Sequence, residues 1–366
     1  MEQVELGTRL PLKRERDSNL ELFRILTMLL IIAHHYVVNS DVGNYIFLYP
    51  DSLRAKGLLL FGAWGKTGIN CFLLITGYFM CRSSITMQKY AKLVLEVLFY
   101  KLVCYIAFSV SGYHSFRLKE FFLLLWPIDS VTDGFTSCYL VFFLLIPFLN
   151  ILIASMDQRQ HGCLVLLLLF VYTVLGTIRS IPVSMNYVSW FAVVYIVGAY
   201  LRYYPVQKFE NIALWGGLCL LCVLASAVSI LLGMDSGSII EAYYYVSDSN
   251  KPFAIATAVC AFLCFKNLRI QHNRWINWMG ASTFGVLQIH ANSDVMRTWL
   301  WRDAVKTADA FMTPLLPLNA VGSVIVIFLV CTLLDRVRII SIERPLFRLW
   351  DKLREKLAGR KKIEAG

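Results

Sequence analysis

The chain has 366 residues, of which 58% are hydrophobic and 16% charged, and its formal net charge is +11. This composition excludes an ordinary soluble domain. Several apolar runs of about 20 residues, each long enough to cross about 30 Å of hydrocarbon, predict an all-α, polytopic helical membrane protein. The basic residues collect at the ends of these runs and in the tail, as the positive-inside bias predicts, so we expect no nucleic-acid partner.

We predict about ten transmembrane helices, at residues 19–38, 57–80, 90–111, 137–154, 162–178, 188–202, 212–233, 252–266, 280–299 and 316–336. An even number of spans places both termini on one side of the membrane. The 234–250 loop has three acidic residues and no Lys or Arg. Because basic segments favour the inside, we expect cytoplasmic termini in a plasma or inner membrane. The predicted parts are a flexible cytoplasmic arm at 1–18, a transmembrane domain at 19–340 and a cytoplasmic tail at 341–366.

The first predicted span carries four ionisable residues, Glu21, Arg24, His34 and His35. A charged group in the bilayer centre costs about 2.5–3.5 kcal/mol, so such residues face a protein interior and are functional candidates. On a helix, Arg24 and His35 share one face and lie about 16 Å apart, whereas His34 is turned about 80° away from His35. Glu21 precedes Arg24 by three residues, the spacing of an ion pair on a helix.

Other positions in later spans have two interpretations each. The apolar stretch at 121–126 is too short to span and predicts a re-entrant or interfacial segment. Tyr139, at the start of the fourth span, belongs either to an interfacial aromatic belt or to a site. His290 lies near the middle of the ninth span with Asp294 one turn on. Either Asp294 orients the His290 imidazole, or Asp294 and Arg297 neutralise each other.

Two further patterns suggest packing and membrane contact. Cys219 with Cys222, and Cys260 with Cys264, have metal-like spacing but no neighbouring His or acidic ligand, so we interpret them as packing residues and expect no metal. In the tail, apolar residues at helical spacing alternate with Lys and Arg. This pattern predicts a basic amphipathic helix on the lipid of the inner leaflet.

The pattern of Arg24, ten residues and then His35 on a first span resembles the opening motif of the membrane-bound acyltransferase 3 family, integral membrane enzymes of the sugar O-acetyltransferase type. The segment GINCFLLITGYFM at 68–80, followed by Arg82, resembles that family's aromatic-rich segment. Thr76 stands there in the position of a Ser, and Cys71 where an aromatic is common. The sequence Ile-Glu-Arg-Pro at 342–345 is a third point of resemblance.

The resemblance implies transfer of an acetyl or other short acyl group from acetyl-CoA, as co-substrate, to a hydroxyl of a cell-surface or secreted glycan or its lipid-linked precursor. It implies that His35 is the catalytic base and that Arg24 acts with it, binding the donor or holding the site's charge. Arg82 suits a CoA phosphate. The supporting candidates are Glu21, His34, Thr76, which would hydrogen-bond in the cavity, Gly77, which would allow close chain approach, Tyr139 and His290. The alternative is a transporter or flippase with an Arg/His relay, although the sequence shows no repeated halves of the kind common in transporters.

Overall fold

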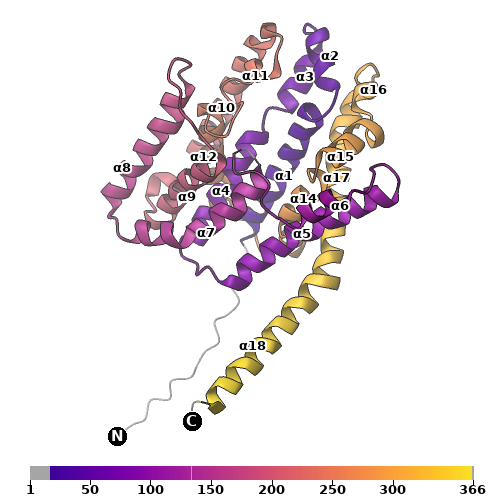
Figure 1. Ribbon diagram of the computed structural model, residues 1–366. Helices are drawn as coiled ribbons and strands as arrows, with labels where there is room; N and C mark the ends of the chain where they lie inside the picture. Colours follow the sequence, from indigo (N-terminus) through magenta and orange to yellow (C-terminus); the bar gives the residue numbers. More distant parts are fainter. Residues whose placement is uncertain (1–16, 133, 365–366) are drawn as a thin grey trace.

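The computed structural model describes residues 17–132 and 134–364, with side chains described as far as Glu355. Within these ranges the regular structure is helical throughout (Figure 1). The predicted flexible arm at 1–18 falls almost wholly outside the described residues. The longer helices are α1 (Ser18–Val38), α3 (Leu53–Phe61), α4 (Gly65–Met80), α5 (Met87–Val110), α7 (Phe135–Ala154), α8 (Gln158–Leu169), α9 (Tyr187–Tyr203), α10 (Ile212–Leu232), α12 (Pro252–Asn267), α14 (Thr283–His290), α17 (Leu316–Arg338) and α18 (Arg344–Glu364).

Short helical segments connect them: α2 (Val42–Leu48), α6 (Leu118–Leu124), η1 (Phe170–Val174), η2 (Leu175–Thr177), η3 (Gln207–Glu210), η4 (Met234–Ser236), α11 (Ile239–Ala242), α13 (Arg274–Gly280), α15 (Asp294–Thr298), η5 (Trp299–Ala304), α16 (Thr307–Phe311) and η6 (Ile339–Glu343). In the described part of the chain, seven helical segments are long and apolar enough to cross a membrane, and the shorter α12 is also apolar. The prediction of a polytopic helical membrane protein is confirmed. The segment predicted to be re-entrant or interfacial is the exposed helix α6, on which Phe122 is 59% exposed.

Two of the predicted spans are each built from two helices separated by a short break. The span at 57–80 consists of α3 and α4, separated by Gly62–Trp64. The span at 280–299 consists of α14 and α15, separated by 291–293. At the second break the Ser293 hydroxyl accepts a hydrogen bond from the Met296 amide (3.2 Å) and starts α15, while the Asn292 side chain donates to the Gln288 carbonyl (2.9 Å). Such side chains compete with the helical hydrogen-bond ladder.

Helix α1 is the central element, since it packs against α4, α12, α13, α14 and α17. One hydrophobic cluster joins α1 to α2, α3, α14 and α17, and a second joins α4, α7, α9 and α12. Between α4 and α9 the backbones are in direct contact at two glycines. A Cβ on Gly77 would lie 2.5 Å from the Tyr195 carbonyl oxygen, and one on Gly198 would lie 2.7 Å from the Leu74 carbonyl oxygen.

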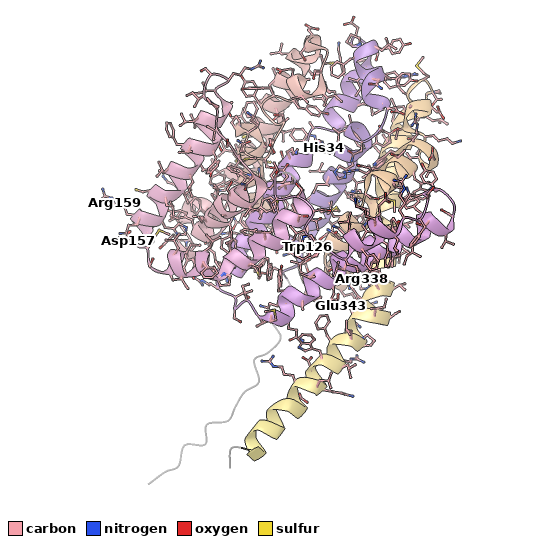
Figure 2. All side chains as sticks on the ribbon, in the orientation of Figure 1. His34, Trp126, Asp157, Arg159, Arg338 and Glu343 are labelled. Atoms are coloured by element: carbon pink, nitrogen blue, oxygen red, sulfur yellow. The ribbon has the colours of Figure 1, made fainter. Side chains whose placement is uncertain are left out.

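A buried ion cluster joins α5, α17 and η6. The Arg338 guanidinium lies 2.9 Å from Asp335, 2.9 Å from Glu343 and 3.0 Å from Glu96, and the Tyr100 hydroxyl donates to Asp335 (2.8 Å). Figure 2 shows Arg338 and Glu343 where α18 leaves the body of the protein. One guanidinium thus contacts three carboxylates, and a second cation, Lys92, lies 2.6 Å from Glu343; buried ions need such partners, because an unpaired charge inside a protein is costly.

The predicted tail helix is present as α18, which extends away from the other helices (Figure 1). Its apolar residues, among them Leu349, Trp350 and Leu353, are 55%, 41% and 52% exposed. Its contact with lipid stays a prediction.

Candidate active site

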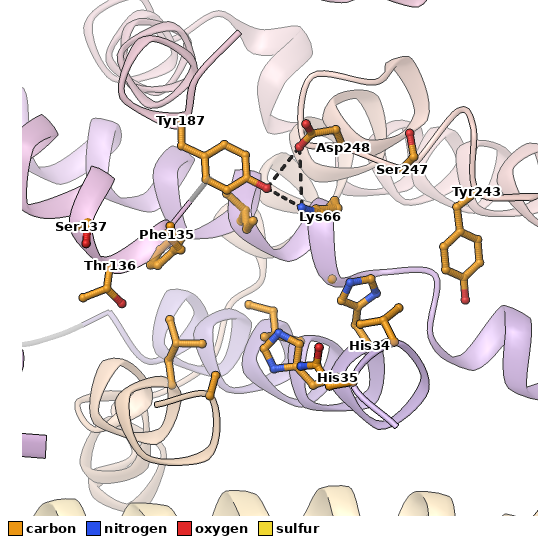
Figure 3. A pocket seen from close by; sticks show the side chains of 18 of the residues that line it. His34, His35, Lys66, Phe135, Thr136, Ser137, Tyr187, Tyr243, Ser247 and Asp248 are labelled. Carbon is orange, nitrogen blue, oxygen red and sulfur yellow. Dashed lines mark hydrogen bonds and ion pairs between the residues drawn. The ribbon is translucent and has the colours of Figure 1, made fainter. Parts of the chain in front are cut away.

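The histidine end of α1 borders a cavity of about 1080 Å³ (Figure 3). Its walls come from α1, α4, the start of α7, α9, α14 and the loop before α12. His34, His35, Lys66, Tyr187 and Asp248 line it. The cavity holds side chains that are far apart in the sequence, and several are titratable.

His35 is hydrogen-bonded to His290, the predicted supporting residue in α14. The His35 Nδ1 atom lies 3.0 Å from His290 Nε2, and His290 Nδ1 lies 2.7 Å from the Val286 carbonyl oxygen. A carbonyl only accepts, so His290 Nδ1 carries a proton and, in the neutral ring, its Nε2 accepts. His35 Nδ1 must then be the donor, which leaves His35 Nε2 with a lone pair at the cavity. This assignment of tautomers follows from the hydrogen-bond network.

The interpretation of His290 as oriented by Asp294 is excluded by this geometry, because both its ring nitrogens are used by Val286 and His35. Asp294 instead pairs with Arg297 on its own helix, the second alternative that the sequence left open. The break after α14 leaves His290 at the last position of that helix, where it faces α1.

His34 lines the same cavity as His35, although we expected it to be turned away from the face that carries the site. The break between α3 and α4 explains this. The His34 Nδ1 donates to the Gly62 carbonyl (2.5 Å), which the interrupted helix leaves available, and Gly65 packs directly on the His34 ring. Irregular backbone at membrane depth is tolerated where it is buried in protein or lines a cavity.

Lys66, Tyr187 and Asp248 form a cluster that sequence reasoning missed. The Lys66 Nζ lies 2.5 Å from the Tyr187 hydroxyl and 3.8 Å from Asp248, and the Tyr187 hydroxyl donates to Asp248 (3.2 Å; Figure 3). Lys66 is also within electrostatic range of His35. The signal that could have found it is a lysine inside a predicted span, the same rule that selected Arg24. Nothing in the local sequence of Tyr187 or Asp248 points to this contact.

The loop that carries Asp248 is fixed by neighbouring helices. The Asn70 side chain donates to the Ser249 carbonyl (2.7 Å) and accepts from the Trp190 indole (2.8 Å). The Asn250 side chain donates to the Tyr172 carbonyl (2.8 Å), in the stretch where α8 gives way to π and 3₁₀ turns. This wall of the cavity is therefore held by hydrogen bonds rather than left as a loose loop.

Across the cavity, Asp129 binds Lys101 (2.8 Å) and Ser137. Burial alone would raise the pKa of Asp129, but the hydrogen bonds from Lys101 and Ser137 outweigh it and hold its pKa below the ordinary value. The carboxylate is therefore ionised at neutral pH and neutralises Lys101. On the same side, the Gln288 side chain donates to the Thr136 hydroxyl (2.9 Å) and ties α14 to α7.

The arginine end of α1 forms a separate cluster. The predicted ion pair is confirmed, with Arg24 and Glu21 3.8 Å apart. Arg24, Thr76 and Tyr139 lie near one another at this end. The Thr76 hydroxyl, expected to hydrogen-bond in the cavity, donates instead to the Phe72 carbonyl of its own helix (2.9 Å). None of the three lines the cavity. Gly280 packs directly against Glu21 and leaves no room for a side chain.

The arginine cluster and the cavity are separated by apolar side chains of the same helix. Met28 and Ile31 lie between Arg24 and His35 in α1 and are 1% and 6% exposed. Arg82, the other predicted donor residue, follows α4 with its guanidinium 4.8 Å from the centre of the Tyr203 ring. The structure does not bring Arg82 to the cavity.

The geometry is that of a helical membrane protein with a histidine pair at a polar cavity. A family model described as an acyltransferase domain, Acyl_transf_3, matches residues 17–336. That range begins just before α1 and ends within α17, so it includes the cavity and the arginine cluster. No curated protein and no solved structure matches the chain. The match covers most of the sequence, and the chain therefore belongs to the acyltransferase 3 family.

Proposed function

We propose that this protein is an O-acyltransferase that moves an acetyl or similarly short acyl group from acetyl-CoA to a hydroxyl of a cell-surface or secreted glycan or its lipid-linked precursor. The observation that carries the proposal is the chain from Val286 through His290 to His35, which directs the lone pair of His35 Nε2 to the cavity. A general base needs this arrangement: a nitrogen free to accept a proton and a partner that fixes the ring.

In the proposed reaction, His35 Nε2 accepts the proton of the acceptor hydroxyl as its oxygen attacks the thioester carbonyl. A C–O bond forms, the C–S bond breaks, and the proton passes to the departing CoA thiolate. The tetrahedral intermediate carries a negative charge on oxygen, which nearby donors or cations stabilise. Lys66 and Arg297 line the same cavity as His35, and their charge suits them to this role.

We further propose that the donor arrives from the cytoplasm and the acceptor from the opposite side. The highly charged CoA nucleotide cannot enter hydrocarbon, so it stays with Arg24 and Arg82. Its slender pantetheine arm then reaches along α1 toward His35, which lies about 16 Å beyond Arg24 at 1.5 Å per residue. The side chains of Met28 and Ile31 are buried between Arg24 and His35, so they must move aside for the thioester to pass.

Inside-out membrane vesicles test the proposal. Radiolabelled acetyl-CoA added outside should place label as an ester on glycan sealed in the lumen, and vesicles with His35→Ala should not. Label only on acceptor added to the CoA side would overturn the transmembrane route. Movement of glycan across the membrane without ester formation would favour the transporter interpretation over transfer.

A further inference from the structure

We infer that the cavity selects acidic acceptors, that is, glycans with a carboxylate or phosphodiester group near the hydroxyl to be acylated; this inference rests on the proposed function. The starting observation is the charge of the walls. Of the described residues that line the cavity, four are cationic (Lys66, Lys101, Lys251 and Arg297) and two are carboxylates (Asp129 and Asp248). Arg297 is paired with Asp294, which is not among the lining residues, so one cation is in excess. A cavity bordered by low-dielectric walls and one excess sign of charge concentrates ligands of the opposite sign.

The carboxylates are already engaged. Asp129 is held by Lys101 (2.8 Å) and Ser137, which cancels the charge of that lysine. Asp248 accepts from the Tyr187 hydroxyl (3.2 Å) and the Ser249 amide (2.7 Å) and lies 3.8 Å from Lys66. Both carboxylates therefore belong to the protein's own network, and neither is poised to bind a sugar cation.

Lys251 is the cation that the protein's network leaves for a ligand. Its Nζ donates to the Gly176 carbonyl (2.9 Å) and lies 4.8 Å from the centre of the Tyr244 ring. Among the residues that the structure describes, no carboxylate forms an ion pair with it within 4.0 Å. A Lys ammonium has three donors, and the hydrogen bond to Gly176 uses one of them.

Lys251 and Lys66 both line the cavity and both interact with the Asp248 carboxylate. Lys66 in turn lies within electrostatic range of His35. An anionic group held at the two lysines thus lies in the same cavity as the base. The hydroxyl of an adjoining sugar carbon or ring is then presented to His35 Nε2, and a neutral sugar lacks this anchor.

The test compares probes of matched shape. Binding to the full-length protein, purified in detergent, is measured for a galacturonic acid trisaccharide, for its fully methyl-esterified form and for a glycerol phosphate trimer. We expect at least one anionic probe to bind about tenfold more tightly than the methyl ester, the size of effect of one charged hydrogen bond. A preference for the carboxylate or for the phosphodiester identifies the acidic group. The advantage should shrink as salt is raised.

Variants assign the effect to the cavity. Lys251→Gln should remove most of the tenfold difference, Lys251→Arg should keep it, and Lys119→Gln, on the exposed helix α6, should leave it unchanged. Equal binding of the acid and its methyl ester, or an unchanged preference in Lys251→Gln, would overturn the inference. Displacement of the bound anionic probe by acetyl-CoA would also overturn the inference, because the cations would then belong to the donor site. The two proposals can fail separately. If the protein binds acidic probes selectively but transfers no acyl group to any hydroxyl, the proposed acyltransferase function is wrong and the charge selectivity stands.

Discussion

Replacement of His290 tests the hydrogen-bond chain behind the proposed base. In His290→Leu the Nδ1–H of His35 loses its acceptor at 3.0 Å, and nothing then favours the tautomer with the lone pair at the cavity. Leaving a part-buried donor unpaired costs about 1–3 kcal/mol. If that cost falls on the transition state, kcat decreases roughly 5- to 150-fold. His290→Gln should restore much of the rate, because its side-chain carbonyl can accept the same hydrogen bond.

The assay measures kcat and KM for acetyl transfer, and the ¹⁵N shifts of the histidine rings report the tautomer. The chain has six histidines, so the spectrum is simple enough to assign by substitution. His161 provides a matched control, since it is fully buried in α8 and bonds the Ile196 carbonyl (3.0 Å) away from the cavity. His161→Leu should lower the melting temperature without a selective loss of kcat. Equal kcat values for His290→Leu and His290→Gln, or a wild-type ring spectrum in His290→Leu, would refute the reasoning.

Three further groups of substitutions test separate parts of the site and fold. His35→Ala should reduce kcat by about 10²- to 10⁴-fold, and His34→Ala by much less because His290 holds only His35; equal losses would show that the base is misassigned. Arg24→Lys should already weaken acetyl-CoA binding, since the planar guanidinium is lost while the charge remains; a wild-type dissociation constant in Arg24→Ala would remove this residue from the donor site. Gly77→Ala should destabilise the protein by about 1–3 kcal/mol, because its methyl group would press on the α9 backbone. Gly217→Ala, with nothing within 4 Å of the added carbon, is the control in thermal unfolding, and similar melting temperatures for the two variants would contradict the packing argument.

Features that depend on helix geometry alone were predictable from the sequence. Glu21 and Arg24 form the expected pair three residues apart, and one unbroken helix carries both Arg24 and His35. The low content of charged residues and the length of the apolar runs predicted a polytopic helical protein. A segment in lipid must form its backbone hydrogen bonds internally, and a helix does so.

Contacts between distant segments were not predictable in the same way. His35 and His290 are 255 residues apart, and the local sequence around His290 offered Asp294 as an equally reasonable partner. The breaks at Gly62–Trp64 and 291–293 were missed because a hydropathy window averages over them while the flanking residues stay apolar. Those breaks free the carbonyl that binds His34 and place His290 at the end of its helix, so the missed details are the ones that build the site.

The ion cluster around Arg338 also bears on how the chain is made. Glu96 lies in α5, near the beginning of the bundle, yet its guanidinium partner is in α17, the last long helix of the body. A ribosome therefore releases α5 into the membrane well before the arginine that compensates its carboxylate exists. We expect a nascent chain that stops short of α17 to expose this uncompensated carboxylate to membrane quality-control proteases. Arrival of α17 would then serve as the final check of correct assembly during biogenesis.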